Sequence, residues 1–292
     1  MGEEFDYDKT LKTKTEDSFL NIQSYLYITS RQITKFLYYT PVTPHQVILA
    51  SLIFGVAASY LIIQPDIVMV IIGAALLFYK NVLDKVDGSL ARARGMDSRR
   101  GRFYDSISDF LVTLALFSAI SYTLYQKYQS KGVFIIGFAA MIFSMLQCSF
   151  FIYYQVSFIK ITGKETVNRL IETVTEKDKA SQDKLTLFLQ RVFQIIYGWQ
   201  DLLIYKLDMF LLNRLEITKF KFKNSKFVSN WYKHKSFLTM ASFLSIGTHM
   251  VLIAFFAVIS SFEMYLFVNL ILMNLLLIWF IIFHYFSIIK KT

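Results

Sequence analysis

Six long apolar segments, separated by shorter polar ones, dominate the pattern of the chain. They span residues 46–63, 67–83, a stretch through Phe110 that ends near Tyr125, 132–159, 237–260 and 264–289. Each is close to the ~20 residues that a helix needs to cross the hydrocarbon core of a bilayer. The pattern therefore predicts an all-α integral membrane protein with six transmembrane helices.

Two other parts of the chain are amphipathic and too polar to cross a bilayer. Residues 18–39 carry apolar side chains at helical spacing, interrupted by charged ones, which predicts an N-terminal interfacial helix. Residues 160–235 separate the fourth and fifth spans. Their first part, 162–184, reads as a polar loop or short helix, and 185–215 as one or two amphipathic cytosolic helices. We expect a tail and interfacial helix over 1–45 and a membrane domain over 46–292, with an insertion at about 160–235.

The composition supports a helical membrane protein. Apolar residues make up 55% of the chain and the mean hydropathy is +0.44, which excludes an ordinary soluble domain. Three prolines and eleven glycines suit long helices better than a β-barrel with many turns. The single cysteine, Cys148, excludes an intrachain disulfide.

The basic residues indicate how the protein lies in its membrane. The formal charge is +10, but the basic residues flank apolar segments, which favours contact with anionic lipid over nucleic acid. All lysines and arginines except Lys127 and Lys131 fall on one side of the predicted topology. The positive-inside rule then places both termini and the insertion in the cytosol. We expect Lys219, Lys221, Lys223 and Lys226 to touch lipid headgroups, and a bacterial-type inner membrane is favoured over an internal membrane.

Four aspartates lie where the second predicted span ends and the third begins. Asp84 and Asp87 are three residues apart, Asp105 and Asp109 are four apart, and a helix would present each pair on one face. Carboxylates beside apolar spans are costly unless something neutralises them, and two divalent cations would do so. No Cys or His lies between Asp84 and Asp109, so Mg²⁺ or Mn²⁺ is favoured over Zn²⁺.

The spacing of this stretch resembles the signature D-x2-D-G-x2-A-R-x8-G-x3-D-x3-D of the CDP-alcohol phosphatidyltransferase family, without a mismatch from Asp84 to Asp109. The resemblance implies transfer of a phosphoalcohol from a CDP-linked donor to a hydroxyl, with release of CMP. It implies that Asp84, Asp87, Asp105 and Asp109 hold two ions and that Asp109 is also the catalytic base. It further implies a homodimer.

The resemblance also implies which residues contact the CDP group. Gly88 and Ala91 share the helix face of the first two aspartates, and their small side chains could admit the nucleotide or allow close helix packing. Arg92 and Ser98 match family positions that contact CDP, and an arginine suits a diphosphate oxygen. Gly101 is expected to give space at the start of the third helix.

Several residues outside the signature can be interpreted in two ways. Arg94, Arg99, Arg100 and Arg102 are expected to be solvated or to face headgroups, although one could bind an anionic acceptor. Residues 197–201 could line an acceptor pocket or anchor Trp199 at the interface. His249 and His284 lie within the last two spans, where we assign them no catalytic role.

The substrates are less well defined by the sequence than the reaction. The family's majority favours CDP-diacylglycerol as donor, and Phe110 stands where members that use inositol phosphate or glycerol phosphate often carry Arg or Lys. A choline- or ethanolamine-type phosphotransferase with diacylglycerol as acceptor is an alternative. So is a non-catalytic transporter or assembly protein.

Overall fold

The computed structural model of this protein describes residues 4–11, 19–21, 25–163, 167–219 and 225–291. Every regular element in these residues is helical. Five stretches are long and apolar enough to cross a membrane: α2 (Pro44–Leu61), α3 (Ile67–Ala93), α4 (Arg99–Tyr128), α5 (Gly132–Ile161) and the run of α12 (Phe262–Phe267), η6 (Val268–Met273) and α13 (Asn274–Lys291). The prediction of an all-α integral membrane protein is confirmed.

The fifth predicted span is broken, so the count of six depends on how it is treated. Residues 237–260 were expected to form one helix, but they divide into α10 (Lys235–Ala241), η5 (Ser242–Leu244) and α11 (Ile246–Val258). The two halves meet at an angle of 41°. Ser245 between them has an extended backbone, with ψ at 154°, which interrupts the helical hydrogen bonds. The bent pair makes a sixth span only if both halves together cross the membrane.

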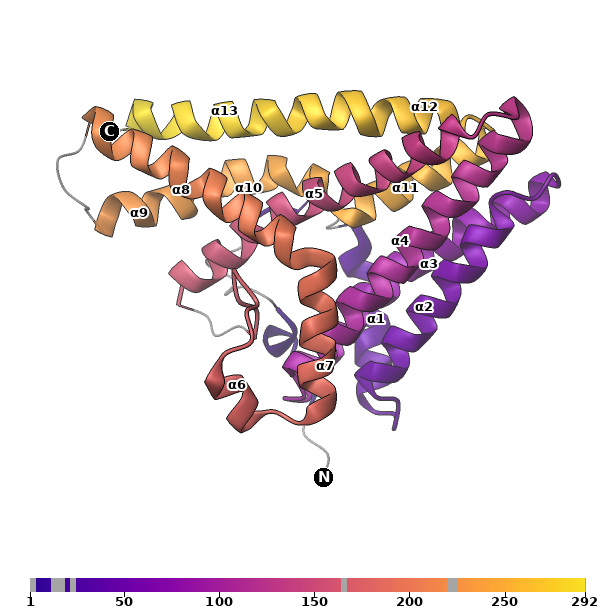
Figure 1. Cartoon of the computed structure of the whole chain (residues 1–292). Helices are drawn as coiled ribbons and strands as arrows, with labels where there is room; N and C mark the ends of the chain where they lie inside the picture. The colour runs from indigo at the N-terminus through magenta and orange to yellow at the C-terminus, as the bar shows by residue number, and fades with distance from the viewer. Residues whose placement is uncertain (1–3, 12–18, 22–24, 164–166, 220–224, 292) are drawn as a thin grey trace.

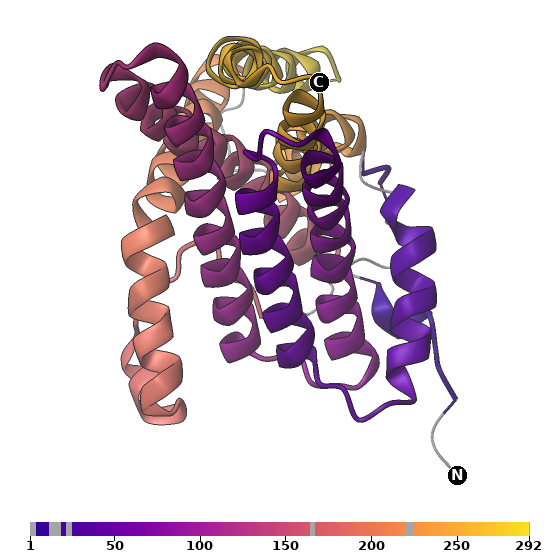
Figure 2. The same ribbon diagram turned by 90° about the vertical axis from the view of Figure 1, so that its right-hand side faces the viewer.

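Helices α2, α3 and α4 pack side by side, and α1 (Leu26–Tyr38) lies on the far side of α3 (Figure 2). Buried Leu26 joins Val47, Val82, Val86 and Leu90 in one apolar cluster, which attaches α1 to the end of α3 that carries the motif. The helix begins at Leu26, later than the predicted residue 18. Its opposite face exposes side chains such as Phe36, as expected for an interfacial helix.

Part of the N-terminal tail is attached to the helix that carries the motif. Residues Asp8–Thr10 form a 3-10 turn, η1, that packs on α3, and Thr10 is buried. This contact brings the start of the chain to the aspartate region.

The insertion forms a long helical arm against the spans. It contains α6 (Glu176–Ser181), α7 (Lys184–Phe193), the π-helical turn η4 (Gln194–Gly198), α8 (Trp199–Lys219) and α9 (Ser225–Tyr232). Helix α7 runs along α4 (Figure 1), where Phe103, Leu189 and Phe193 form a small apolar cluster. Residues 185–215 are therefore helical, as predicted, and α7 is amphipathic whereas α8 is not. Lys219, Lys221, Lys223 and Lys226 lie outside the residues whose side chains are described.

A buried carboxylate fastens α8 to its neighbours. Asp208 is fully buried and accepts hydrogen bonds of 2.6 to 3.0 Å from Tyr153, Tyr154, Trp231 and Tyr232. Four donors satisfy the desolvated carboxylate, so it joins α5, α8 and α9 without needing a cation.

Close packing of α2 on α4 leads to a stability prediction. A Cβ atom built on Gly55 would lie 2.5 Å from the Val112 side chain, so any larger residue forces the helices apart. We expect Gly55→Val to lower the free energy of unfolding by about 1–3 kcal/mol, measured by thermal unfolding in detergent. Gly132→Ala is the control, because its Cβ would meet only Ser130 Oγ at 3.4 Å. Equal stability of the two variants would contradict the packing argument.

Candidate active site

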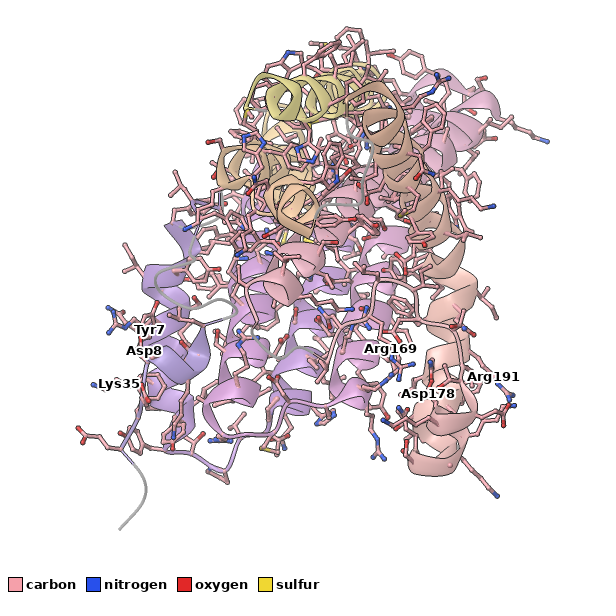
Figure 3. The ribbon with its side chains drawn as sticks, turned by 90° about the vertical axis from the view of Figure 1, so that its left-hand side faces the viewer. Tyr7, Asp8, Lys35, Arg169, Asp178 and Arg191 are labelled. Carbon is pink, nitrogen blue, oxygen red and sulfur yellow. The ribbon has the colours of Figure 1, made fainter. Side chains whose placement is uncertain are left out.

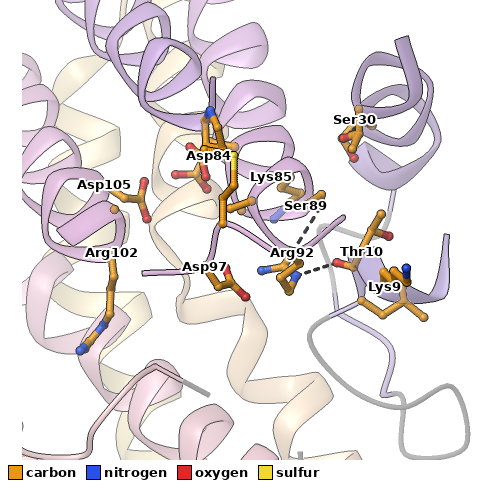
Figure 4. A pocket seen from close by; sticks show the side chains of 18 of the residues that line it. Lys9, Thr10, Ser30, Asp84, Lys85, Ser89, Arg92, Asp97, Arg102 and Asp105 are labelled. Atoms are coloured by element: carbon orange, nitrogen blue, oxygen red, sulfur yellow. Dashed lines mark hydrogen bonds between the residues drawn. The ribbon is translucent and has the colours of Figure 1, made fainter. Parts of the chain in front are cut away.

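Three of the four predicted aspartates converge. Carboxylate oxygens of Asp84, on α3, and of Asp105 and Asp109, on α4, all lie within 4.8 Å of one another. Figure 4 shows Asp84 and Asp105 facing each other across the gap between the helices. The turn that brings α3 back as α4 contains Gly95, whose φ of +63° favours glycine. The turn therefore lets Asp84 on α3 face both Asp105 and Asp109 on α4.

The fourth aspartate, Asp87, lies one turn further along α3 and is buried. Its Oδ2 atom has no hydrogen-bond partner among the described residues. An unpaired buried carboxylate oxygen beside three converging carboxylates is a donor set that suits a hard divalent cation. The residues present therefore fit a divalent-metal site.

Lys80 is the functional residue that the sequence reasoning missed. It lies within the apolar part of α3, is fully buried, and pairs with both Asp109 and Asp84, the latter at 3.6 Å. One ammonium against four carboxylates lowers their mutual repulsion but leaves the site strongly negative. The i,i+4 spacing from Asp84 could have indicated it. Asp109, however, is 29 residues away in the chain.

A cavity of about 740 Å³ opens beside these acids, and its walls include every predicted site residue except Asp109. The signature members of its lining are Asp84, Asp87, Gly88, Ala91, Arg92, Gly101 and Asp105, and Ser98 lines it as well. Parts of η1 and α1 complete the wall. A cavity of this size can take a nucleotide diphosphate.

The two signature glycines make room for polar side chains of this cavity. A Cβ on Gly88 would lie 3.2 Å from a terminal nitrogen of Arg92, and one on Gly101 would lie 3.3 Å from Ser98 Oγ. Arg92 Nε donates to the Thr10 carbonyl at 2.7 Å, as Figure 4 shows. Ser98 Oγ accepts from the Gly101 amide and caps α4.

A second, smaller cavity of about 180 Å³ adjoins the acids. Its lining includes Asp105, Asp109, Arg102, Tyr197 and Asp201. Asp105 and Arg102 border both cavities, so the two cavities meet at the acids. Tyr197 and Asp201 line this cavity and Trp199 is 43% exposed, so an acceptor pocket and an interfacial anchor both stay predictions for residues 197–201.

The expectation that Arg94 is solvated is wrong. Its guanidinium donates to the backbone carbonyls of Leu37, Tyr38, Thr40 and Val42, at the end of α1 and just beyond it. The last carbonyls of a helix lack their full set of helical donors, and a cation is favourable at a helix C-terminus. Arg94 therefore ties the interfacial helix to the turn between α3 and α4.

The expectation is also wrong for Arg99 and Arg102, which are largely buried against the insertion, whereas the Arg100 side chain is 42% exposed as expected. Arg99 and Arg102 both pair with Glu172, and Arg100 pairs with Asp183 at 2.8 Å. The Glu172 side chain is completely buried, so it depends on these cations.

A second acid extends this network. Asp178 pairs with Arg99 and, through two hydrogen bonds of 2.7 and 2.8 Å, with Arg169. Figure 3 shows Arg169 and Asp178 together beside α7. The hydrogen bonds from Arg169 lower the pKa of the Asp178 carboxyl, despite the burial that opposes this shift.

The two membrane histidines lie apart from the acids. His249 Nδ1 is 3.4 Å from the Tyr265 hydroxyl, and His284 stacks on Phe237. Neither histidine lines either cavity.

Comparison with known proteins identifies the family of the chain. The sequence profile of the CDP-alcohol phosphatidyltransferase family matches residues 41–280, which include the whole motif and every residue that lines the smaller cavity. The chain belongs to the CDP-alcohol phosphatidyltransferase family. Membership supports a transferase activity of that kind in a multi-pass membrane protein, and it agrees with divalent-metal binding by the acidic cluster. A comparison with curated protein sequences finds no match to this CDP-alcohol phosphatidyltransferase.

Lys80 leads to a prediction about metal affinity. Lys80→Met removes the ammonium beside Asp84 and Asp109 but keeps an unbranched side chain. We expect Mn²⁺ to bind this variant at least about tenfold more tightly, because a unit charge at ~4 Å is worth several kcal/mol in a protein. Electron paramagnetic resonance of free Mn²⁺ measures the affinity. Lys80→Arg keeps the charge and is the control, and equal affinity of Lys80→Met and the wild type would contradict the prediction.

Proposed function

We propose that this protein transfers a phosphatidyl group from CDP-diacylglycerol to the hydroxyl of a small alcohol and releases CMP. The observation that carries the proposal is the position of the acids. Asp84, Asp105 and Asp109 converge where a large cavity and a small one meet. Donor and acceptor could then approach the acids from opposite sides, as an in-line displacement needs.

The larger cavity is the proposed donor site. Arg92 suits an oxygen of the diphosphate, and the small residues Gly88 and Ala91 let the nucleotide approach the helix backbone. Ser98 can donate a hydrogen bond from its hydroxyl, while Gly101 keeps that side of α4 open. These assignments follow the positions of the family signature.

The reaction needs one bond to form and one to break. The acceptor oxygen attacks the phosphorus that carries the diacylglycerol, the bond from that phosphorus to the bridging oxygen of the diphosphate breaks, and CMP leaves. We assign Asp109 as the base that takes the hydroxyl proton, with Lys80 holding its carboxylate in place. Two Mg²⁺ or Mn²⁺ ions held by Asp84, Asp87, Asp105 and Asp109 would withdraw charge from the phosphoryl oxygens and stabilise the leaving group.

The proposal extends to the membrane setting. The Lys and Arg distribution supports a cytosolic active site with both termini on the same side, in a bacterial-type inner membrane. Soluble alcohols and nucleotides are available there. Family membership supports a homodimer.

The first functional prediction concerns metal dependence. Purified protein in detergent should release CMP from CDP-diacylglycerol when an alcohol and Mg²⁺ or Mn²⁺ are present. Excess chelator should abolish the release, because the proposed ligands are carboxylates alone. Chromatographic measurement of CMP is sufficient. Full turnover in metal-free buffer would refute the role of the acidic cluster.

The second functional prediction separates metal binding from proton transfer. Asp109→Asn keeps the side-chain shape but loses the base, so turnover should fall by roughly 10²–10⁴-fold and stay low as metal is raised. Asp84→Asn should weaken metal binding alone, so activity should partly return at high Mg²⁺ or Mn²⁺. Initial rates across a metal titration compare the two variants. Recovery of Asp109→Asn with metal would show that Asp109 is a ligand and not the base.

A further inference from the structure

The charged side chains that line the smaller cavity differ in whether they have an oppositely charged partner. Its two arginines, Arg102 and Arg169, are each paired with an acid of the insertion, Glu172 and Asp178 respectively. Asp105 and Asp109 belong to the metal cluster. Asp201 is the remaining charged residue of the lining, and it makes no hydrogen bond or ion pair with any residue that the structure describes.

Capping of a helix N-terminus does not explain why an aspartate stands at position 201. Helix α7, the π-helical turn η4 and α8 follow one another without a break, so the start of α8 has no free amide group for Asp201 to cap. A π-helical turn inside a longer helix is often found at a functional site. Burial raises the pKa of the Asp201 carboxyl to about 7, so a cationic partner would favour its ionised form.

The cavity has the size and composition of a site for a small polar molecule. Its volume of about 180 Å³ is too small for an acyl chain, and Met145, Ile152 and Val156 form an apolar part of its wall. The Tyr197 hydroxyl donates to the Ser106 carbonyl at 2.9 Å and so fixes the π-helical turn against α4, next to Asp105. Asp201 is thereby held on a rigid element beside the reacting acids.

We propose that the acceptor is a small amino alcohol whose ammonium group binds Asp201 while its hydroxyl faces Asp109. This inference rests on the proposed phosphatidyl transfer. An anionic acceptor, such as a phosphorylated alcohol, would meet the carboxylates of Asp105, Asp109 and Asp201, whereas Arg102 and Arg169 share the buried carboxylates of Glu172 and Asp178 with Arg99. An ammonium against a partly buried carboxylate is a charge-assisted contact that a neutral alcohol cannot make.

A panel of acceptors tests the inference with the purified protein, CDP-diacylglycerol and Mg²⁺ or Mn²⁺. We expect serine, ethanolamine or choline to give a kcat/KM for CMP release at least about tenfold above those of inositol, inositol phosphate and glycerol phosphate. Preference for a phosphorylated alcohol or for inositol would overturn the amino-alcohol inference and leave the transfer reaction intact. No CMP release with any acceptor would instead refute the proposed function.

A variant pair tests Asp201 directly. Asp201→Asn keeps the shape of the side chain and removes its charge. We expect it to reduce kcat/KM for ethanolamine at least about tenfold. The kcat/KM for ethylene glycol, which is the uncharged analogue of ethanolamine, should not change. A merely structural defect would lower both rates together. Glu176→Gln is the control, because Glu176 has a side chain 87% exposed on the same insertion. An unchanged ratio of ethanolamine to ethylene glycol in Asp201→Asn would overturn the inference.

Discussion

Repulsion among carboxylates at the edge of the membrane is the constraint on which the rest of the site depends. Three aspartates converge within 4.8 Å and a fourth is buried one helical turn away. Such a cluster is stable only where positive charge is supplied. Lys80 supplies part of that charge from within α3, and its complete burial leaves it no other partner than the acids beside it in the described residues. The remaining negative charge makes the cluster a cation site.

The short connection between α3 and α4 fixes the surroundings of this cluster. Arg94 holds the end of α1, while Arg99 and Arg102 hold Glu172 of the insertion. Removing one partner of a buried pair leaves an uncompensated charge that costs several kcal/mol. The same few residues therefore position the wall of the larger cavity on one side and the wall of the smaller cavity on the other.

Much of the fold and of the acidic site follows from local pattern, because apolar runs define the spans and helical spacing brings Asp84 toward Asp105 and Asp109. Contacts between distant segments do not follow from it. The partner of Arg102 lies 70 residues away, and that of Arg94 more than 50, so both looked like solvated charges. Residues 237–260 looked like one span because the break at Ser245 depends on backbone conformation and not on hydropathy.

The two cavities draw on different parts of the chain, and this division bears on specificity. The walls of the larger one contain seven signature positions, from Asp84 to Asp105. The smaller one takes Arg169, Tyr197 and Asp201 from the insertion. A fixed signature can hold the nucleotide and the reacting phosphoryl group in any family member, whereas an insertion can vary without disturbing them. Under the proposed function, the motif determines the reaction and the insertion determines which alcohol is admitted, so Asp201 can select the acceptor without touching the donor.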